Sequence, residues 1–134
     1  MHNAELDLRW ILERDPENAS ALNALGYMLT INTTRYIDAL ALIEQAISLE
    51  PDDPAIRDSL GWVYFKLGRV EEAQQELERA YSELPDEEVA AHLLELYWST
   101  GQKKQARKLY REMSKQNEEL PIMDALVDSL SIKL

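Results

Sequence analysis

The stretch DSLGWVYFKLGRVEEAQQELERAYSELP, residues 58–85, decides the fold of this chain. Its second half places Ala73, Leu77 and Ala80 at steps of four and three residues, and Pro85 follows five residues later. Side chains at offsets of four and seven residues from the first lie on one face of a helix. Proline ends a helix because it lacks an N–H and restricts the residue before it. This half is therefore predicted to be one helix with a narrow apolar face.

The same offsets recur along the whole chain, which marks it as a repeat array. The copies begin at Ala4, Ala39, Ala73 and Ala106, at spacings of 35, 34 and 33 residues. In the fourth copy, Glu118 stands where the others have proline. The recurrence predicts four equivalent helices.

A second helical pattern precedes each of the last three copies. Its apolar and glycine positions are Leu22, Leu25, Gly26 and Leu29, then Leu60, Gly61 and Tyr64, then Leu93, Leu94 and Tyr97. Short turns around Gly68 and Gly101 follow two of these patterns, where glycine can adopt the left-handed conformation that closes a helix. The matching turn 32–35 has no glycine. Each repeat is thus predicted to be a pair of helices.

Small residues at the expected crossing points explain how such a pair would pack. Antiparallel helices lie about 8 to 10 Å apart, and small side chains allow the closer approach. Gly26 is expected to face Ala39, and Gly61 to face Ala73. Leu94 occupies the glycine position of the third pair, which is therefore expected to be wider.

These positions resemble the tetratricopeptide repeat, whose pattern of about 34 residues has leucine, glycine and tyrosine on its first helix and alanines with a closing proline on its second. Residues 58–85 match this pattern, and Arg57 replaces the family's early tryptophan. The runs 23–27 and 58–62 are also similar to those of repeat proteins of bacterial cell envelopes, some of them lipoproteins. That second likeness points to a bacterial periplasm or envelope, and a cytoplasmic location also fits a chain without cysteine.

The resemblance implies an all-α fold, a right-handed superhelix of antiparallel helix pairs. The expected units are 1–17 as the second helix of a partial repeat, 18–52, 53–86 and 87–120 as three repeats, and 121–134 as a C-terminal capping helix. A capping helix would shield the open end of the array. The capping segment is richer in apolar residues than one narrow face requires, so self-association through it is an alternative.

Composition excludes several classes of function. The formal net charge of −11 opposes binding to nucleic acid and to anionic membrane surfaces, and no apolar run reaches the length of a bilayer span. No phosphate-binding loop, nucleophile elbow or HExxH motif is present, so we expect no enzyme, catalytic residue or cofactor. His92 and Glu95 have a spacing that metal sites use, but zinc needs three or four ligands. They are interpreted as a polar pair on an open helix face, with no metal bound.

The resemblance also places a candidate binding surface on the first helix of each pair, which lines the inner side of the superhelix. A protein or peptide segment is the expected partner, and neutral or basic apolar segments are favoured because no cation stands where chaperone-binding relatives hold a terminal carboxylate. The candidate residues are Asn23, Tyr27, Asp58, Trp62, Phe65, His92, Glu95 and Trp98.

The aromatic residues of this set admit two interpretations. Aromatic side chains are enriched at binding hot spots, but they also pack inside a superhelix. For Trp62 and Trp98 both remain open, while Tyr64 and Tyr97 are interpreted as packing residues. The binding hypothesis predicts that Trp62→Ala weakens a partner and leaves thermal unfolding nearly unchanged.

The last second helix carries a basic stripe that comprises Lys103, Lys104, Arg107, Lys108, Arg111 and Lys115. It can dock an acidic surface, including another copy of the chain in a homo-oligomer, or it can simply be solvated. We thus predict a scaffold or adaptor that binds a protein segment in its groove. The alternative is a structural oligomerisation module of a larger bacterial envelope protein.

Overall fold

The computed structural model describes residues 3–134, which form eight helices and no strands. Asn18, Asp53 and Asp86 precede three of the helices, and the side chain of each accepts a hydrogen bond from a backbone N–H of the first turn. The helices are α1 (Ala4–Arg14), α2 (Ala19–Asn32), α3 (Tyr36–Leu49), α4 (Pro54–Lys66), α5 (Val70–Glu83), α6 (Glu87–Ser99), α7 (Lys103–Gln116) and α8 (Pro121–Leu130).

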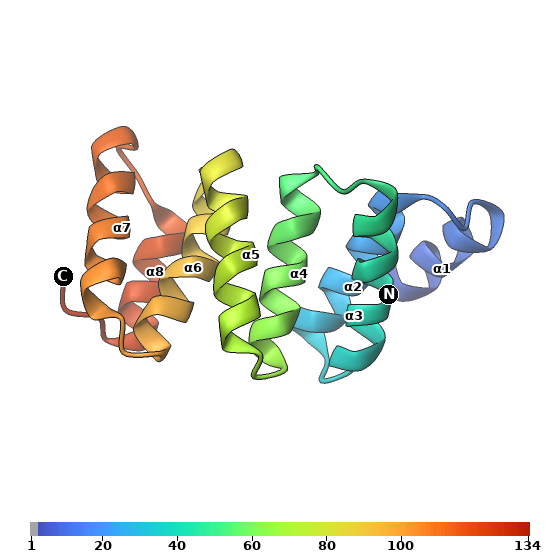
Figure 1. Ribbon diagram of the computed structural model, residues 1–134, viewed down its shortest axis with the longest axis horizontal. Coiled ribbons are helices and arrows are strands. Elements are labelled where there is room, and N and C mark those ends of the chain that lie inside the picture. Colours follow the sequence, from blue (N-terminus) through green and yellow to red (C-terminus); the bar gives the residue numbers. More distant parts are fainter. Residues whose placement is uncertain (1–2) are drawn as a thin grey trace.

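The helices stack along the long axis of the molecule, from α1 at one end to α7 and α8 at the other (Figure 1). Helices α2 and α3, α4 and α5, and α6 and α7 pack as pairs. The first helices of successive pairs also touch: α2 contacts α4, and α4 contacts α6. Apolar burial is divided between two clusters, one over α2 to α4 and one over α4 to α8. The all-α solenoid is confirmed, whereas the division into the repeats given above stays a prediction.

Glycine allows close contact in the first two pairs. A Cβ atom at Gly26 would lie 2.5 Å from Cγ1 of Ile43 and 3.0 Å from the carbonyl oxygen of Ala39. A Cβ atom at Gly61 would lie 2.7 Å from Cγ of Leu77. The three atoms nearest to that position all belong to Leu77, as Ile43 is nearest at the first crossing, and the expected facing of Gly61 and Ala73 stays a prediction.

The third pair is wider, as Leu94 predicted. Leu94 is completely buried at the position where the other pairs have glycine. The Leu94 side chain occupies the space between the two backbones. Fewer Cα atoms of α6 and α7 lie close together than in the first two pairs. The wider spacing thus coincides with a large side chain at the glycine position.

The glycine turns adopt the predicted left-handed conformation, with φ of 80° at Gly68 and 81° at Gly101. After α4, the N–H of Arg69 donates to the carbonyl of Tyr64 at 2.9 Å and the N–H of Gly68 to that of Phe65 at 3.0 Å. These two bonds form a Schellman motif, which satisfies carbonyl groups that the helix end leaves free.

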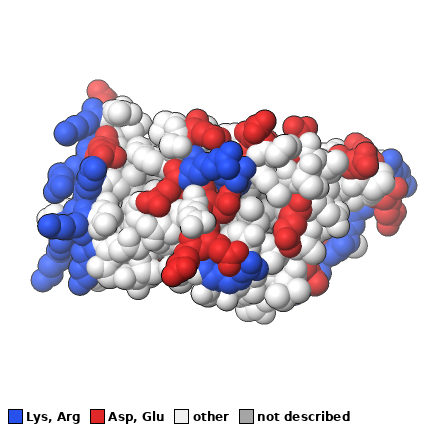
Figure 2. All heavy atoms as spheres, in the orientation of Figure 1, with Lys and Arg blue, Asp and Glu red and all other residues white. Residues whose placement is uncertain are grey.

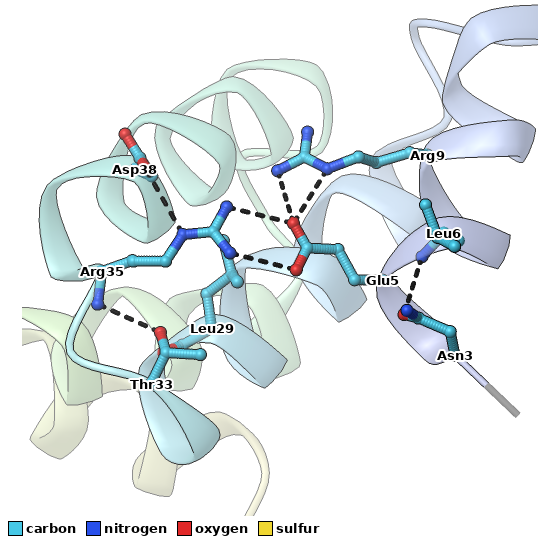
Figure 3. A network of polar contacts seen from close by, with 8 residues as sticks. All are labelled: Asn3, Glu5, Leu6, Arg9, Leu29, Thr33, Arg35 and Asp38. Carbon is cyan, nitrogen blue, oxygen red and sulfur yellow. Dashed lines mark hydrogen bonds and ion pairs between the residues drawn. The ribbon is translucent and has the colours of Figure 1, made fainter. Parts of the chain in front are cut away.

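The turn without glycine is held by side chains instead (Figure 3). The hydroxyl of Thr33 donates to the carbonyl of Leu29 and accepts from the N–H of Arg35 at 3.0 Å. The Arg35 guanidinium donates to both carboxylate oxygens of Glu5 at 3.0 Å, which ties α1 to this turn. Hydrogen bonds from Arg35 and Arg9 lower the pKa of Glu5.

Arg57, which replaces the family tryptophan, is buried as an ion pair. Its Nη1 lies 2.5 Å from Oε2 of Glu76, and its Nη2 donates to the carbonyl of Pro51 at 2.8 Å. The Arg57 side chain is 9% exposed and that of Glu76 is 24% exposed. The pair joins α4 to α5 where an indole would otherwise pack.

Glu76→Ala is expected to lower the free energy of unfolding by about 2 kcal/mol, because it leaves a buried guanidinium without its counterion. Denaturant unfolding followed by circular dichroism measures the change. The double variant Arg57→Met/Glu76→Ala is the control, because it removes both charges and is expected to lose less stability than the single variant. Equal stability of Glu76→Ala and the wild-type chain would contradict this account.

Helix α8 packs on α6, and a hydrogen bond joins it to α7. Met123 is completely buried, and its backbone N–H donates to Oε2 of Glu87 at 2.9 Å. The hydroxyl of Tyr110 on α7 donates to Oδ1 of Asp124 at 2.5 Å. Within residues 3–134, no helix is long and apolar enough to cross a membrane.

Candidate protein-binding groove

The predicted binding residues lie on α2, α4 and α6, and six of the eight line two adjoining hollows. The larger hollow, about 600 Å³, is lined by Tyr27, Trp62, His92 and Glu95. The smaller, about 210 Å³, is lined by Asn23, Tyr27 and Asp58. Tyr27 and Glu88 line both, so the two hollows form one continuous surface, which we call the concave groove.

A chain of polar contacts joins the three helices that line the concave groove. His92 Nδ1 lies 2.9 and 3.0 Å from the two carboxylate oxygens of Asp58. His92 Nε2 lies 3.2 Å from the hydroxyl of Tyr27, which in turn lies 3.0 Å from Oε1 of Glu88. His92 therefore pairs with Asp58 and is buried, which corrects the expected pairing with Glu95 on an open face.

Whether His92 Nε2 carries a proton determines whether the Tyr27 hydroxyl donates its hydrogen bond to Glu88 or to His92. When both ring nitrogens carry protons, Nδ1–H donates to Asp58 and Nε2–H donates to Tyr27, whose hydroxyl donates to Glu88. When Nε2 carries no proton, it accepts a hydrogen bond from the Tyr27 hydroxyl, and Glu88 loses this donor. Burial, followed by the charge of Glu88, raises the pKa of Tyr27, so its hydroxyl remains a donor in both arrangements.

Trp62 forms the floor of the groove and is itself packed. Its ring stacks on His92 with centroids 4.3 Å apart and on Phe65 with centroids 5.1 Å apart. Only 6% of the residue is exposed. The expectation that Trp62→Ala leaves thermal unfolding nearly unchanged is thereby revised, because a residue so enclosed contributes to stability.

Phe65 and Trp98 line neither hollow. Trp98 lies at the end of α6, where Lys103 Nζ is 4.9 Å and the Arg107 guanidinium carbon is 5.7 Å from its ring. Two members of the basic stripe thus cover this indole. Tyr97 is buried and its hydroxyl donates to Oε2 of Glu78 at 2.5 Å, in agreement with its interpretation as a packing residue.

Sequence reasoning missed one wall of the groove, which comes from α8. Ile122, Ala125, Leu126 and Ser129 line the larger hollow opposite α4 and α6. Ile122 is 48% exposed there. The sequence feature that could have indicated this wall is the surplus of apolar residues in 121–134, for which the sequence analysis offered self-association as an alternative.

The charge of the molecule is unevenly distributed. The residues lining the larger hollow include the acids Glu88 and Glu95 and no lysine or arginine. Lysine and arginine gather instead along the end of the molecule formed by α7 (Figure 2). Among residues 3–134, no three histidine, cysteine or acidic side chains are grouped so that they could hold a metal ion.

Paired antiparallel helices stacked into an array, with first helices lining one continuous groove, define the class of this chain as an α-solenoid. Residues 34–94 match the family model described as tetratricopeptide repeat. Residues 34–94 therefore carry the tetratricopeptide repeat. The expected resemblance is thereby confirmed.

One relative agrees with this repeat, and solved structures agree with the fold. A TPR repeat-containing protein of Pseudomonas aeruginosa is 53% identical over 89 residues, which cover 66% of this chain and 15% of that protein. A thermophilic TPR protein of Thermus thermophilus has a TM-score of 0.81 at 21% identity, covering 96% of this chain and 72% of that one. A tetratricopeptide repeat protein of Parabacteroides merdae has a TM-score of 0.80 at 17% identity, covering 94% and 49%. The chain thus spans 15% of the length of its curated relative.

Proposed function

We propose that this chain is a non-catalytic scaffold segment that binds an extended or helical stretch of a partner protein in the concave groove. The observation that carries the proposal is the continuity of the two hollows across α2, α4, α6 and α8. A surface that runs across several helices suits an elongated ligand better than a compact one.

An unpaired polar atom supports the same proposal. The side-chain oxygen of Asn23, which lines the smaller hollow, is buried and has no hydrogen-bond partner among the described residues. A buried acceptor without a partner is costly, and rotation of the Asn23 side chain toward the smaller hollow would let a backbone N–H of a bound segment satisfy it. The groove therefore offers apolar area and a hydrogen-bond acceptor within one site.

Ala125→Trp tests the groove directly, because an indole on this exposed position of α8 would fill the larger hollow. An array of short synthetic peptides of apolar, basic and acidic composition is first screened with the wild-type chain. The peptides that bind are expected to lose about tenfold in affinity for Ala125→Trp, as measured by fluorescence anisotropy.

Ala41→Trp is the matched control, because Ala41 is exposed on α3 and lines neither hollow. It should bind the selected peptides like the wild-type chain. Peptides that bind Ala125→Trp with unchanged affinity would place the binding surface elsewhere, and an array without any binder would reject peptide binding.

A further inference from the structure

The concave groove contains two carboxylates that have no cation to balance them. Glu88 is exposed and Glu95 is half-buried, and both line the larger hollow. Within residues 3–134, neither forms an ion pair, and the Tyr27 hydroxyl is the hydrogen-bond partner of Glu88. The histidine in the same hollow is paired with Asp58. The hollow therefore has uncompensated negative charge.

Lys66 lies beside the concave groove and does not neutralise these acids. It lines a neighbouring hollow together with Glu95, but its Nζ lies 4.9 Å from the centre of the Trp62 ring and forms no ion pair among the described residues. Contact with an aromatic face holds an ammonium group without a carboxylate. Glu95 is thus open to a cation from outside.

The surroundings of the two acids are largely apolar. Ala91, Trp62 and, from α8, Ile122 and Leu126 line the same hollow. Contacts of Trp62 with His92, and of His92 with Tyr27, join three helices here. A carboxylate beside low-dielectric walls attracts a cation more strongly than one in open water. Lysine and arginine suit such a site because their aliphatic stems pack on apolar surface while the charged end reaches the acids.

We infer that the larger hollow is a subsite for a lysine or arginine side chain of the partner segment, with the cation between Glu88 and Glu95 and apolar neighbours against α8. This inference rests on the proposed function and specifies its partner as a basic, apolar peptide. When the Tyr27 hydroxyl donates to Glu88, it orients the Glu88 carboxylate.

Three labelled synthetic peptides test the subsite. They share one leucine and alanine frame and differ in a single central residue, which is lysine, norleucine or glutamate. The lysine peptide is expected to bind the wild-type chain about fivefold more tightly than the norleucine peptide, and added salt should reduce the difference. The glutamate peptide should bind most weakly.

Glu88→Gln/Glu95→Gln should remove the preference for lysine while the norleucine peptide keeps its affinity. Glu44→Gln/Glu71→Gln is the control, because it removes the same charge from exposed positions of α3 and α5 that line neither groove hollow. Equal binding of the lysine and norleucine peptides to the wild-type chain would overturn the subsite, as would a preference that survives in Glu88→Gln/Glu95→Gln. If Ala125→Trp still weakened both peptides, the groove itself would stand. If Ala125→Trp changed nothing, the proposed function would fail first.

Discussion

Replacing Trp62 by alanine is expected to lower the free energy of unfolding by about 3 to 5 kcal/mol, the usual cost of deleting a buried aromatic side chain. The indole is 6% exposed and stacks on His92 and Phe65. Its loss would open a cavity at the point where α4 meets α6. Denaturant unfolding, fitted for the free energy in water, measures the change.

Trp98→Ala is the matched control for this prediction. Trp98 is half-buried and its ring is approached by Lys103 and Arg107. A smaller loss of stability is expected, because part of that surface already faces water. If both variants lost the same stability, or Trp62→Ala unfolded at the wild-type midpoint, the enclosed position of Trp62 would be refuted.

Gly26→Leu is expected to cost about 3 kcal/mol through overpacking. The first carbon of any side chain at this position would already lie 2.5 Å from Cγ1 of Ile43 and 3.0 Å from the backbone oxygen of Ala39. Better helix propensity returns only about 1 kcal/mol. Thermal unfolding followed by circular dichroism gives the difference in midpoint.

A double-mutant cycle with Ile43→Ala provides the control. The clash is with the Ile43 side chain, so Gly26→Leu should cost less in an Ile43→Ala background than in the wild-type chain. Additive losses would show that the cost of Gly26→Leu does not come from the Ile43 side chain. Leu94 stands at the same register in a pair whose backbones are farther apart.

Helix pairing could be predicted from sequence because its causes are local. The distance between Gly26 and Ala39, or between Gly68 and the end of α4, is short in the chain, and a periodic pattern reports directly on such contacts. The residue closest to Gly61 could not be read in this way. Ala73 and Leu77 lie on the same face of one helix, and only side-chain packing brings Leu77 nearest to the glycine.

The sequence predicted which residues are candidates for the groove, but not the contacts that these residues make with one another. The sequence by itself determined that Tyr27, Asp58, Trp62 and His92 lie on first helices, because their register follows from the repeat. Only the tertiary structure decided that Asp58 pairs with His92 across 34 residues, that Tyr27 reaches His92 across 65, and that Trp62 is enclosed between rings. The physical reason is that helix periodicity specifies which face a residue occupies, whereas the spacing and rotation of stacked pairs set which side chains from distant repeats meet.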